Sequence, residues 1–357
     1  MTAVAIAGAG GIAYASAAWL AHGGHAVRLW SPRGDTAHGL RTQPLQSDGV
    51  LQASAAVQVA ATAQELVSGA DVVLIAVPVN GHKFVMDALL PHLQDGQHVI
   101  VSSMSSLSAL YLYEQARERG VDITVASMGT TALTARRTGD AGVRIMTRRS
   151  ELGLSCLPID RADEAVALAR SLFGDVFVPE ANCLASTLVN INPVAHGPLA
   201  LFNWTRIERA ENWPQYHYMT PHVAGVIEQL DRERIALAAA FGLTVRTIEE
   251  HFAKSFGTSS QRLADIAAEL HAKRGGPPGP TDVDTRFLGE DVPYGLVFSL
   301  ALGNCANVEL PATRAIVQMA NLVTGRDFDR ENDLLAPLHI AQATPGELLA
   351  RVNRTTR

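Results

Sequence analysis

The first residues constrain the fold of this chain more than any other part. Residues 3–7 read AVAIA, an apolar run of strand length, and residues 8–13 read GAGGIA at the start of an alanine-rich helical stretch. A G-x-G-x-x-A turn between a strand and a helix is typical of dinucleotide-binding domains, because its glycines allow a tight turn and a close approach of pyrophosphate. The amides at the helix start then face the phosphates. An ordinary glycine turn is the alternative. The residues expected to bind the pyrophosphate are Gly8, Gly10, Gly11, Ile12 and Ala13.

Strands and helices alternate over the first half of the chain. Apolar runs predict strands at residues 26–30, 56–61, 72–77, 97–102, 122–126 and 176–178, and two more at the far edge, 143–147 and 152–157. Helical spacing predicts helices at residues 12–22, 63–68, 81–93, 106–119 and 161–172. Thr62 suits the N-cap of the helix at 63–68. This alternation predicts an α/β Rossmann domain with a doubly wound parallel sheet in residues 1–180.

The pattern changes near residue 180. From residue 181 onward, apolar residues recur at helical spacing, which predicts helices at 183–191, 221–241, 247–252, 259–273, 293–302 and 311–324. Residues 274–280 read RGGPPGP and predict a loop, because proline and glycine interrupt helices. We therefore expect residues 181–357 to form an all-helical substrate domain.

The composition argues against several other classes of protein. With 357 residues, 47% hydrophobic and 18% charged, the chain can bury two cores. The net charge of −6 is atypical of nucleic-acid binding, and no apolar run approaches the roughly 20 residues that span a bilayer. Cys156, Cys183 and Cys305 have neither a CxxC pair nor metal-ligand spacing. We expect reduced thiols in a cytoplasmic protein and no metal site.

The residues after the second predicted strand bear on the choice between NAD and NADP. An acid there would bind the 2′-hydroxyl of the adenosine ribose, but the sequence reads LWSPR and has no acid before Asp35. Ser31 and Arg33 can instead contact a 2′-phosphate. This favours NADP(H); NAD with a solvated Arg33 is the alternative. Val77 and Pro78 end the fourth predicted strand and are expected beside the nicotinamide ribose.

Three segments of the second half combine reactive side chains with residues that fix the backbone. His196 lies between two prolines in NINPVAHGP, with a buried structural histidine as the alternative. Arg286 and Asp291 lie in RFLGEDVP before a predicted helix, where the alternative is a surface arginine and an N-cap aspartate. Thr220 begins TPH at the start of another predicted helix. That helix carries three charged residues that suit a solvated face: Asp231, Glu233 and Arg234.

Together with the glycine turn, these segments resemble the opine dehydrogenase family, also called the octopine/nopaline dehydrogenase family. The resemblance rests on GAGGIA, VPVNGH, NPVAHGP, TPHVAGVIEQLDRER, TRFLGEDVPYGL and VELPATRAIVQMANLVTGRDF, which run from residue 8 to about residue 328. The last block is the most discriminating, and the chain is similar to the shorter bacterial type. The resemblance implies a Rossmann domain followed by an all-helical domain, as the predicted elements do.

The resemblance also implies roles for individual residues. His196 corresponds to the family's catalytic histidine and Asp291 to its partner. Arg286 corresponds to an arginine that binds a substrate carboxylate, and Asn192 and Thr220 are expected to contact substrate. The implied reaction condenses a 2-oxo acid with the amino group of an amino acid and reduces the imine with NAD(P)H. Histidine suits this chemistry because it gives and takes a proton near neutral pH.

The amino-acid partner is less determined. Gly129, Thr130 and Thr131 stand where relatives carry an acid and a threonine, and Tyr218 and Met219 are candidates to line the amine pocket. A substrate with the basic side chain of arginine or lysine would be expected to pair with an acidic residue in its pocket. A small or apolar amine partner is therefore favoured.

Two other functions remain as alternatives. A plain 2-oxo acid reductase or hydroxy acid dehydrogenase of this plan commonly uses a lysine near residues 186–191, and none is present. A non-catalytic cofactor-sensing protein would have a decayed site, whereas His196, Arg286 and Asp291 are all present. The expected partners are the two small substrates and a second copy in a homodimer, with neither nucleic acid nor membrane.

Overall fold

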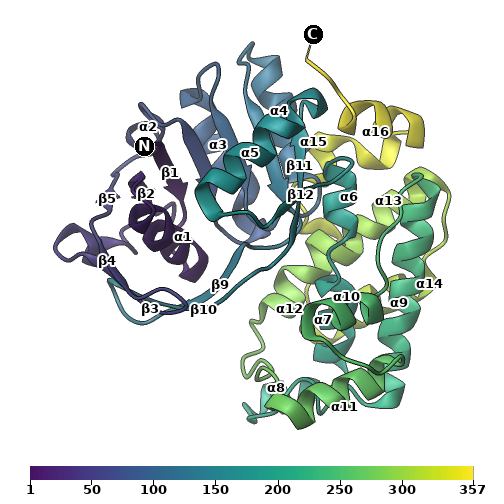
Figure 1. Ribbon diagram of the computed structural model, residues 1–357. Coiled ribbons are helices and arrows are strands. Elements are labelled where there is room, and N and C mark those ends of the chain that lie inside the picture. The colour runs from purple at the N-terminus through teal and green to yellow at the C-terminus, as the bar shows by residue number, and fades with distance from the viewer. Residues whose placement is uncertain (357) are drawn as a thin grey trace. The chain divides into compact units, whose positions relative to one another are not determined.

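The first apolar run forms a strand, as predicted, and this strand lies in the interior of a large sheet. The structure is a computed structural model, in which residues 1–356 are described (Figure 1). The strands of residues 1–187 are β1 (Ala3–Ala7), β2 (Ala26–Trp30), β3 (Leu45–Gly49), β4 (Ala53–Ala55), β5 (Gln58–Val59), β6 (Val72–Ile75), β7 (His98–Val101), β8 (Thr124–Met128), β9 (Leu133–Arg137), β10 (Gly142–Arg148), β11 (Leu152–Leu157) and β12 (Phe177–Pro179). Its helices are α1 (Gly11–His22), α2 (Ala63–Val67), α3 (His82–Leu89), α4 (Ser108–Glu118), α5 (Ala162–Phe173) and α6 (Cys183–Leu188).

The main sheet has the order β12-β11-β8-β7-β6-β1-β2-β5. β1 runs parallel to both neighbours, with Val4 opposite Val27 on one side and Val72 on the other. The strand order reverses at β1, and in doubly wound sheets the carboxyl edge at this switch point holds the ligand. The predicted parallel sheet is interrupted near its far edge, because β11 runs antiparallel to β8 with Leu154 opposite Met128. The Rossmann architecture is otherwise as predicted.

A second sheet, which the sequence pattern does not reveal, has the order β4-β3-β10-β9. Residues 143–147 were expected at the far edge of the main sheet, and that placement is wrong: they belong to β10, which pairs with β3 and β9. The strands of this sheet contact α1. Because residues 11–22 contain no Asp, Glu, Lys or Arg, α1 can be covered on several sides, and residues 13–18 are all buried.

Local signals fix the remaining helices of this unit. The Thr62 hydroxyl accepts a hydrogen bond from the Glu65 amide at 3.1 Å, so the predicted N-cap of α2 is confirmed. The helices form two contacting groups, α1 with α5, and α2 with α3 and α4. Two groups are expected where helices cover both faces of a sheet.

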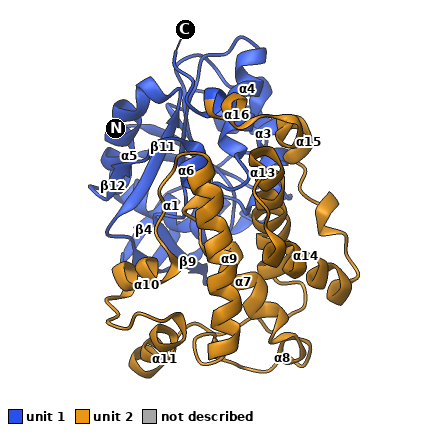
Figure 2. Cartoon of the chain, turned by 90° about the vertical axis from the view of Figure 1, so that its right-hand side faces the viewer, with its two compact units in different colours: residues 1–187, 350–357 blue, residues 188–349 orange. Residues whose placement is uncertain are grey.

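Residues 188–349 form a second unit made of helices (orange in Figure 2). They are α7 (Asn192–Leu201), α8 (Trp204–Glu208), α9 (Pro221–Ala240), α10 (Ile248–Phe256), α11 (Leu263–Arg274), α12 (Arg286–Gly289), α13 (Phe298–Ala306), α14 (Pro311–Thr324) and α15 (Leu335–Leu338). The bounds of α14 are those predicted, and residues 275–280 are non-helical as expected. The helix predicted at 293–302 is divided into a π-helical segment, Val292–Val297, and α13.

Asp231, Glu233 and Arg234 of α9 are buried, and the expectation that they form a solvated face is wrong. The Glu233 carboxylate accepts from the amides of Ala312 and Thr313 at 2.8 and 2.9 Å and so caps α14. Asp231 pairs with Arg234 at 2.7 Å, and both side chains are at most 4% exposed. Burial raises the pKa of the Asp231 carboxyl. These polar groups fix the contact of α9 with its neighbours, since a buried charge must be paired.

The first unit comprises residues 1–187 and the segment from residue 350 onward (blue in Figure 2). The predicted division has one break, between residues 180 and 181, and includes the C-terminal segment in the helical domain. The C-terminal segment is attached instead by an ion pair between Arg351 and Glu114 at 2.7 Å and a hydrogen bond from Asn182 to Asn353. α16 (Pro345–Val352) leads into this segment. None of the helices in residues 1–356 combines the length and apolar character needed to cross a membrane.

Candidate active site

The glycine turn after β1 has the geometry that its sequence predicts. Gly8 has a φ of +142°, and a Cβ on it would lie 2.4 Å from the carbonyl oxygen of Ala76. Only glycine fits there, on both grounds. A Cβ on Gly10, by contrast, would have no atom within 4 Å, so the space beside this residue is open. The turn is therefore tight on the Gly8 side and open on the Gly10 side, as close approach of a pyrophosphate requires.

The start of α1 leaves its amides available. Gly10 is the N-cap and brings no capping side chain, and the first turn has no acid. The first amide bonded within the helix is that of Tyr14, which donates to Gly10. The preceding amides of Gly11, Ile12 and Ala13 have no acceptor among the described residues, which suits a bound anion. These residues fit the pyrophosphate of a dinucleotide.

Gly11 has a second reason to be glycine. A Cβ there would lie 2.7 Å from the carbonyl oxygen of Ala135 and 3.2 Å from the Cα of Arg136. Strand β9 therefore passes directly over the start of α1. The sequence motif alone gives no sign of this contact, because the two segments are more than a hundred residues apart.

The loop after β2 presents a free guanidinium. Arg33 is exposed and has no hydrogen bond or ion pair within residues 1–356. Ser31 is buried, and its hydroxyl is hydrogen-bonded to that of Thr36, which closes the loop. The first acid after β2, Asp35, is engaged with Arg41 at 3.5 Å. The loop therefore exposes both charges, but the Asp35 carboxylate is paired with Arg41, whereas the Arg33 guanidinium has no partner among residues 1–356.

The end of β6 is held by a buried histidine. Val77 is half-buried and Pro78 is exposed, and both follow β6 at the carboxyl edge of the sheet. His82 hydrogen-bonds the Val77 carbonyl through Nε2 at 3.1 Å and the Ser108 hydroxyl through Nδ1 at 2.9 Å. Burial lowers the pKa of His82 to about 4, so the ring is neutral and structural. Its bonds fix the loop that carries Val77 and Pro78.

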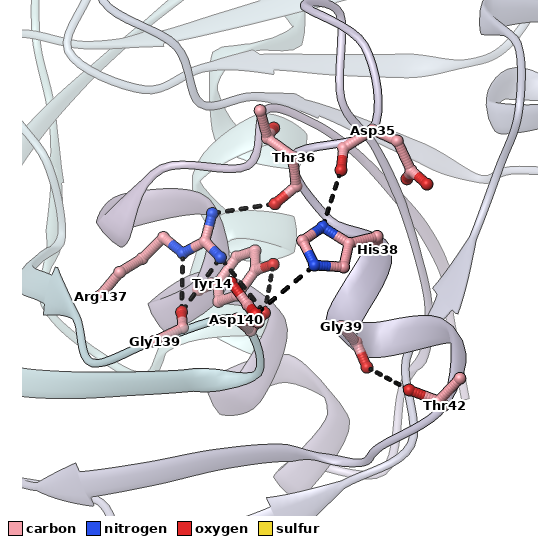
Figure 3. A network of polar contacts seen from close by, with 9 residues as sticks. All are labelled: Tyr14, Asp35, Thr36, His38, Gly39, Thr42, Arg137, Gly139 and Asp140. Atoms are coloured by element: carbon pink, nitrogen blue, oxygen red, sulfur yellow. Dashed lines mark hydrogen bonds and ion pairs between the residues drawn. The ribbon is translucent and has the colours of Figure 1, made fainter.

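An arginine that the sequence analysis did not single out joins the cofactor segments. Arg137, at the end of β9, donates to the carbonyl of Ala9 in the glycine turn and to that of Thr36 in the loop after β2. Figure 3 shows the bond to Thr36. The only local sign of this role is the pair Arg136-Arg137 before the polar turn TGDA.

The second unit contains a histidine–carboxylate pair. His196 Nδ1 lies 2.8 Å from the Oδ2 of Asp291, and the two side chains are 14% and 10% exposed. Asp291 occupies the cap position of the π-helical segment, but its side chain makes no cap bond there. Nε2 of His196 has no hydrogen bond within the described residues. The arrangement leaves one ring nitrogen for a reacting group.

Packing fixes the orientation of this imidazole. Its ring stacks on that of Phe287 with centroids 3.8 Å apart and planes within 4°. A Cβ on Gly295 would lie 2.3 Å from Pro193, so α7 and the π-helical segment touch where no side chain fits between them. π-helical turns are frequent at functional sites. Phe287 has no sequence signal of its own and is recognised only from this stacking.

The other expected substrate residues lie at helix starts of the same unit. Arg286 is the first residue of α12, is exposed, and has its guanidinium 6.0 Å from the Phe287 ring. Asn192 begins α7 four positions before His196, which places it on the same face of that helix. Thr220 precedes α9 with an exposed side chain, and no hydrogen bond of the described residues links it to the pair. Tyr218 instead packs under Arg206, and Met219 is buried.

A cation, Arg149, lies beside Thr130 and Thr131. Arg149 donates to the Thr131 carbonyl at 3.1 Å and to the Thr130 hydroxyl at 3.2 Å. Burial lowers the pKa of Arg149, and it has no carboxylate partner among residues 1–356.

Within residues 1–356, no three His, Cys, Asp or Glu side chains come together as metal ligands.

The two units match known families separately. Residues 179–324 match the family described as NAD/NADP octopine/nopaline dehydrogenase, alpha-helical domain. Residues 3–108 match the N-terminal domain of NAD-dependent glycerol-3-phosphate dehydrogenase. Each match falls largely within one of the two units.

Known proteins extend this likeness to the whole chain. An opine dehydrogenase of Arthrobacter sp. (strain 1C) is 28% identical, with 98% of each chain covered. A solved structure of octopine dehydrogenase with NADH and L-arginine has a TM-score of 0.81 at 17% identity, covering 100% of this chain and 99% of the other. A yersinopine dehydrogenase with NADP+ has a TM-score of 0.74 at 16% identity, covering 99% and 98%. Residues 179–324 thus match the helical domain of the NAD/NADP octopine/nopaline dehydrogenases, and over nearly its whole length the chain is similar to an opine dehydrogenase.

Proposed function

We propose that this protein condenses a 2-oxo acid with the amino group of an amino acid and reduces the resulting imine with NAD(P)H. The product is an N-(1-carboxyalkyl) amino acid, an opine. The observation that carries the proposal is the His196–Asp291 pair, 2.8 Å apart, with Nε2 of the histidine left open. This pair can supply the proton transfers that a condensation requires. A protein that only binds a cofactor has no need of such transfers.

In the first step His196 acts as a base. With its Nδ1 proton donated to Asp291, the neutral ring carries a lone pair on Nε2. Nε2 takes a proton from the substrate ammonium, and the freed amine attacks the carbonyl carbon of the oxo acid. A C–N bond forms, the C–O double bond becomes single, and the oxygen receives the proton that the attacking nitrogen gives up, so the proton on His196 is kept. Asp291 stabilises the imidazolium formed in this step.

In the second step the same imidazolium acts as an acid. It returns a proton to the hydroxyl group, which leaves as water, and a C=N bond remains. When bound, the nicotinamide supplies the hydride that reduces this carbon. The overall reaction consumes one oxo acid, one amino acid, one NAD(P)H and one proton, and releases water. Arg286, exposed and unpaired among the described residues, suits a substrate carboxylate as a bidentate donor. Asn192 and Thr220 are proposed as further substrate contacts.

NADP(H) is proposed as the preferred cofactor. The glycine turn and the open amides of Gly11, Ile12 and Ala13 would hold the pyrophosphate. Arg33 is a free cation where an NAD-specific site would have an acid. Ser31 supports the loop through its bond to Thr36. Val77 and Pro78 are proposed beside the nicotinamide ribose.

The amine substrate is proposed to be a small or apolar amino acid rather than one with a cationic side chain. Gly129, Thr130 and Thr131 provide no carboxylate, and the guanidinium of Arg149 lies against Thr130 and Thr131. A cationic side chain placed there would meet a like charge without a counterion, which is unfavourable in a half-buried site. Small and apolar amino acids avoid this cost.

The compartment proposed is the cytoplasm, where NAD(P)H is available and thiols stay reduced. All three cysteines are free, and burial raises the pKa of both Cys156 and Cys183 to about 12. A second copy of the chain as partner remains a prediction.

One assay tests the proposed reaction. Purified protein is given NADPH or NADH with a 2-oxo acid, in the presence and absence of a panel of small, apolar, acidic and basic amino acids. Oxidation of the cofactor that requires both substrates supports the proposal, and mass spectrometry of the secondary amine identifies the pair. Oxidation with the oxo acid alone indicates a plain reductase. Cofactor binding without turnover on any pair indicates a sensor.

A further inference from the structure

The guanidinium of Arg137 is saturated by backbone carbonyls of three separate segments. Figure 3 shows its bonds to Thr36, Gly139 and Asp140. Its Nη1 donates to Ala9 at 3.2 Å and to Thr36 at 3.0 Å. Its Nε and Nη2 donate to Gly139 at 3.2 and 3.0 Å, and Nη2 also donates to Asp140 at 3.2 Å. One side chain therefore ties the glycine turn and the loop after β2 to the β9–β10 turn.

The β9–β10 turn is docked independently of these bonds. Tyr14 lies under the Arg137 guanidinium at 4.3 Å, and its hydroxyl donates to the Asp140 carbonyl at 3.0 Å. On the other side His38 Nε2 lies 3.4 Å from the Asp140 carboxylate. A Cβ on Gly39 would lie 2.6 Å from the Cβ of Asp140, so the backbones there are in close contact. The turn is thus a fixed support for Arg137 rather than a free loop.

We infer that Arg137 is a positioning residue for the dinucleotide, and that the β9–β10 hairpin is part of the cofactor site. The inference rests on the proposed cofactor binding. In a planar trans peptide the N–H points opposite to the C=O. When Arg137 holds the Ala9 carbonyl, the amide of Gly10 is directed away from the guanidinium, and that amide belongs to the turn that is open to a ligand. The bond to Thr36 holds the end of the loop that carries Arg33 in the same way.

Arg137 itself is not a phosphate ligand in this arrangement. Its five hydrogen bonds all go to protein carbonyls, so none of its donors is reserved for a phosphate. Arg137 instead orders the glycine turn and the loop after β2 before the cofactor binds. These two segments then lose less conformational entropy on binding. Removing the Arg137 side chain should weaken dinucleotide binding without changing the proton transfers of His196.

The test compares Arg137→Ala and Arg137→Lys with Arg144→Ala, an exposed arginine of the same hairpin that lies 3.7 Å from Asp48. Dissociation constants for NADPH, NADH and ADP-ribose are measured by calorimetry, together with Tm and with kcat at saturating cofactor. Arg137→Ala should raise the dissociation constants of all three ligands about tenfold or more, because all three contain the pyrophosphate. Its kcat at saturation and the KM for the oxo acid should stay within about twofold, and Arg144→Ala should match the wild type.

Unchanged dissociation constants for Arg137→Ala, whatever its Tm, would overturn the inference. If that variant does not fold, Arg137→Lys provides the test, because lysine keeps the positive charge but lacks the planar, forked set of N–H donors of the guanidinium. A folded lysine variant with weaker ligand binding supports the inference, and one that binds as the wild type does refutes it. Failure of the proposed cofactor binding is distinguishable, because the wild-type protein would then bind neither NADPH nor NADH. Failure of the proposed reaction alone would leave the wild-type dissociation constants measurable, and the comparison with Arg137→Ala would still test the inference.

Discussion

His196 and Asp291 are 95 positions apart in sequence, and their Nδ1 and Oδ2 atoms lie 2.8 Å apart. The pair joins the middle of α7 to the residue before the π-helical segment. Because the carboxylate accepts from Nδ1, Nε2 is the nitrogen available as a base. The tautomer of this one histidine therefore determines whether the site can accept a proton.

Replacing Asp291 with asparagine should lower kcat by about 10²–10⁴-fold, because an amide that donates to Nδ1 would move the ring proton to Nε2. His196→Ala should have an effect of similar size. The dissociation constant of NADPH should change little in both variants, since its proposed ligands lie in the other unit. Steady-state kinetics and calorimetry check both quantities.

The matched control is Asp327→Asn, which alters an acid of the same unit that pairs with Arg330 at the surface. It should keep the wild-type kcat. A near wild-type rate in Asp291→Asn or His196→Ala would remove the catalytic assignment.

The glycines of the turn should respond differently to alanine. Gly8→Ala places a methyl group against the Ala76 carbonyl at a φ of +142° and should cost about 3 kcal/mol of unfolding free energy or more. Gly10→Ala meets no protein atom within 4 Å, so stability should stay within about 0.5 kcal/mol while NADPH affinity falls about tenfold. Urea unfolding and cofactor titration separate the two effects. Wild-type affinity in Gly10→Ala would place the pyrophosphate elsewhere.

Arg33 should set the preference for NADP(H). A charge-assisted bond to a 2′-phosphate contributes about 1.5–3 kcal/mol, so Arg33→Ala should raise the KM for NADPH about tenfold or more and leave that for NADH nearly unchanged. The comparison variant is Arg41→Ala, because the Arg41 side chain is already bonded to Asp35 and to the Val59 carbonyl. Equal effects of Arg33→Ala on both cofactors would contradict the proposed preference.

His82 should make stability depend on pH. Burial lowers its pKa to about 4 from the ordinary 6.5, so between these values the unfolded chain binds a proton that the native protein does not. The contribution of the neutral His82 ring to the free energy of unfolding is therefore complete above pH 6.5. This contribution falls by about 3 kcal/mol as the pH falls towards 4.

Unfolding free energies at pH 7 and pH 4.5 test this linkage. His82→Gln, which can keep polar contacts with Val77 and Ser108 but cannot titrate, should lose less stability over this interval than the wild type. His22→Gln, at an exposed position on α1, should behave as the wild type does. Equal pH dependence in His82→Gln and wild type would exclude His82 as the cause.

Much of the fold could be predicted because its signals are local. The spacing of Gly8, Gly10 and Ala13 predicts the turn, Thr62 predicts the start of α2, and the apolar period predicts α14 with its observed bounds. The second sheet could not be predicted, since β3 reads LQSDG and lacks the β-branched and aromatic residues typical of strands. β3 is a strand because α1 and β10 lie against it.

By itself, then, the sequence determined the dinucleotide turn, the two-part architecture and the reactive residue types, because short-range spacing and composition encode them. The tertiary structure decided which of those residues meet. It pairs His196 with Asp291, stacks Phe287 on the histidine and buries the Asp231–Arg234 pair of α9. It also brings Arg137 to the glycine turn, 128 positions from Ala9. Such contacts depend on where the chain returns in space, and no local pattern specifies that.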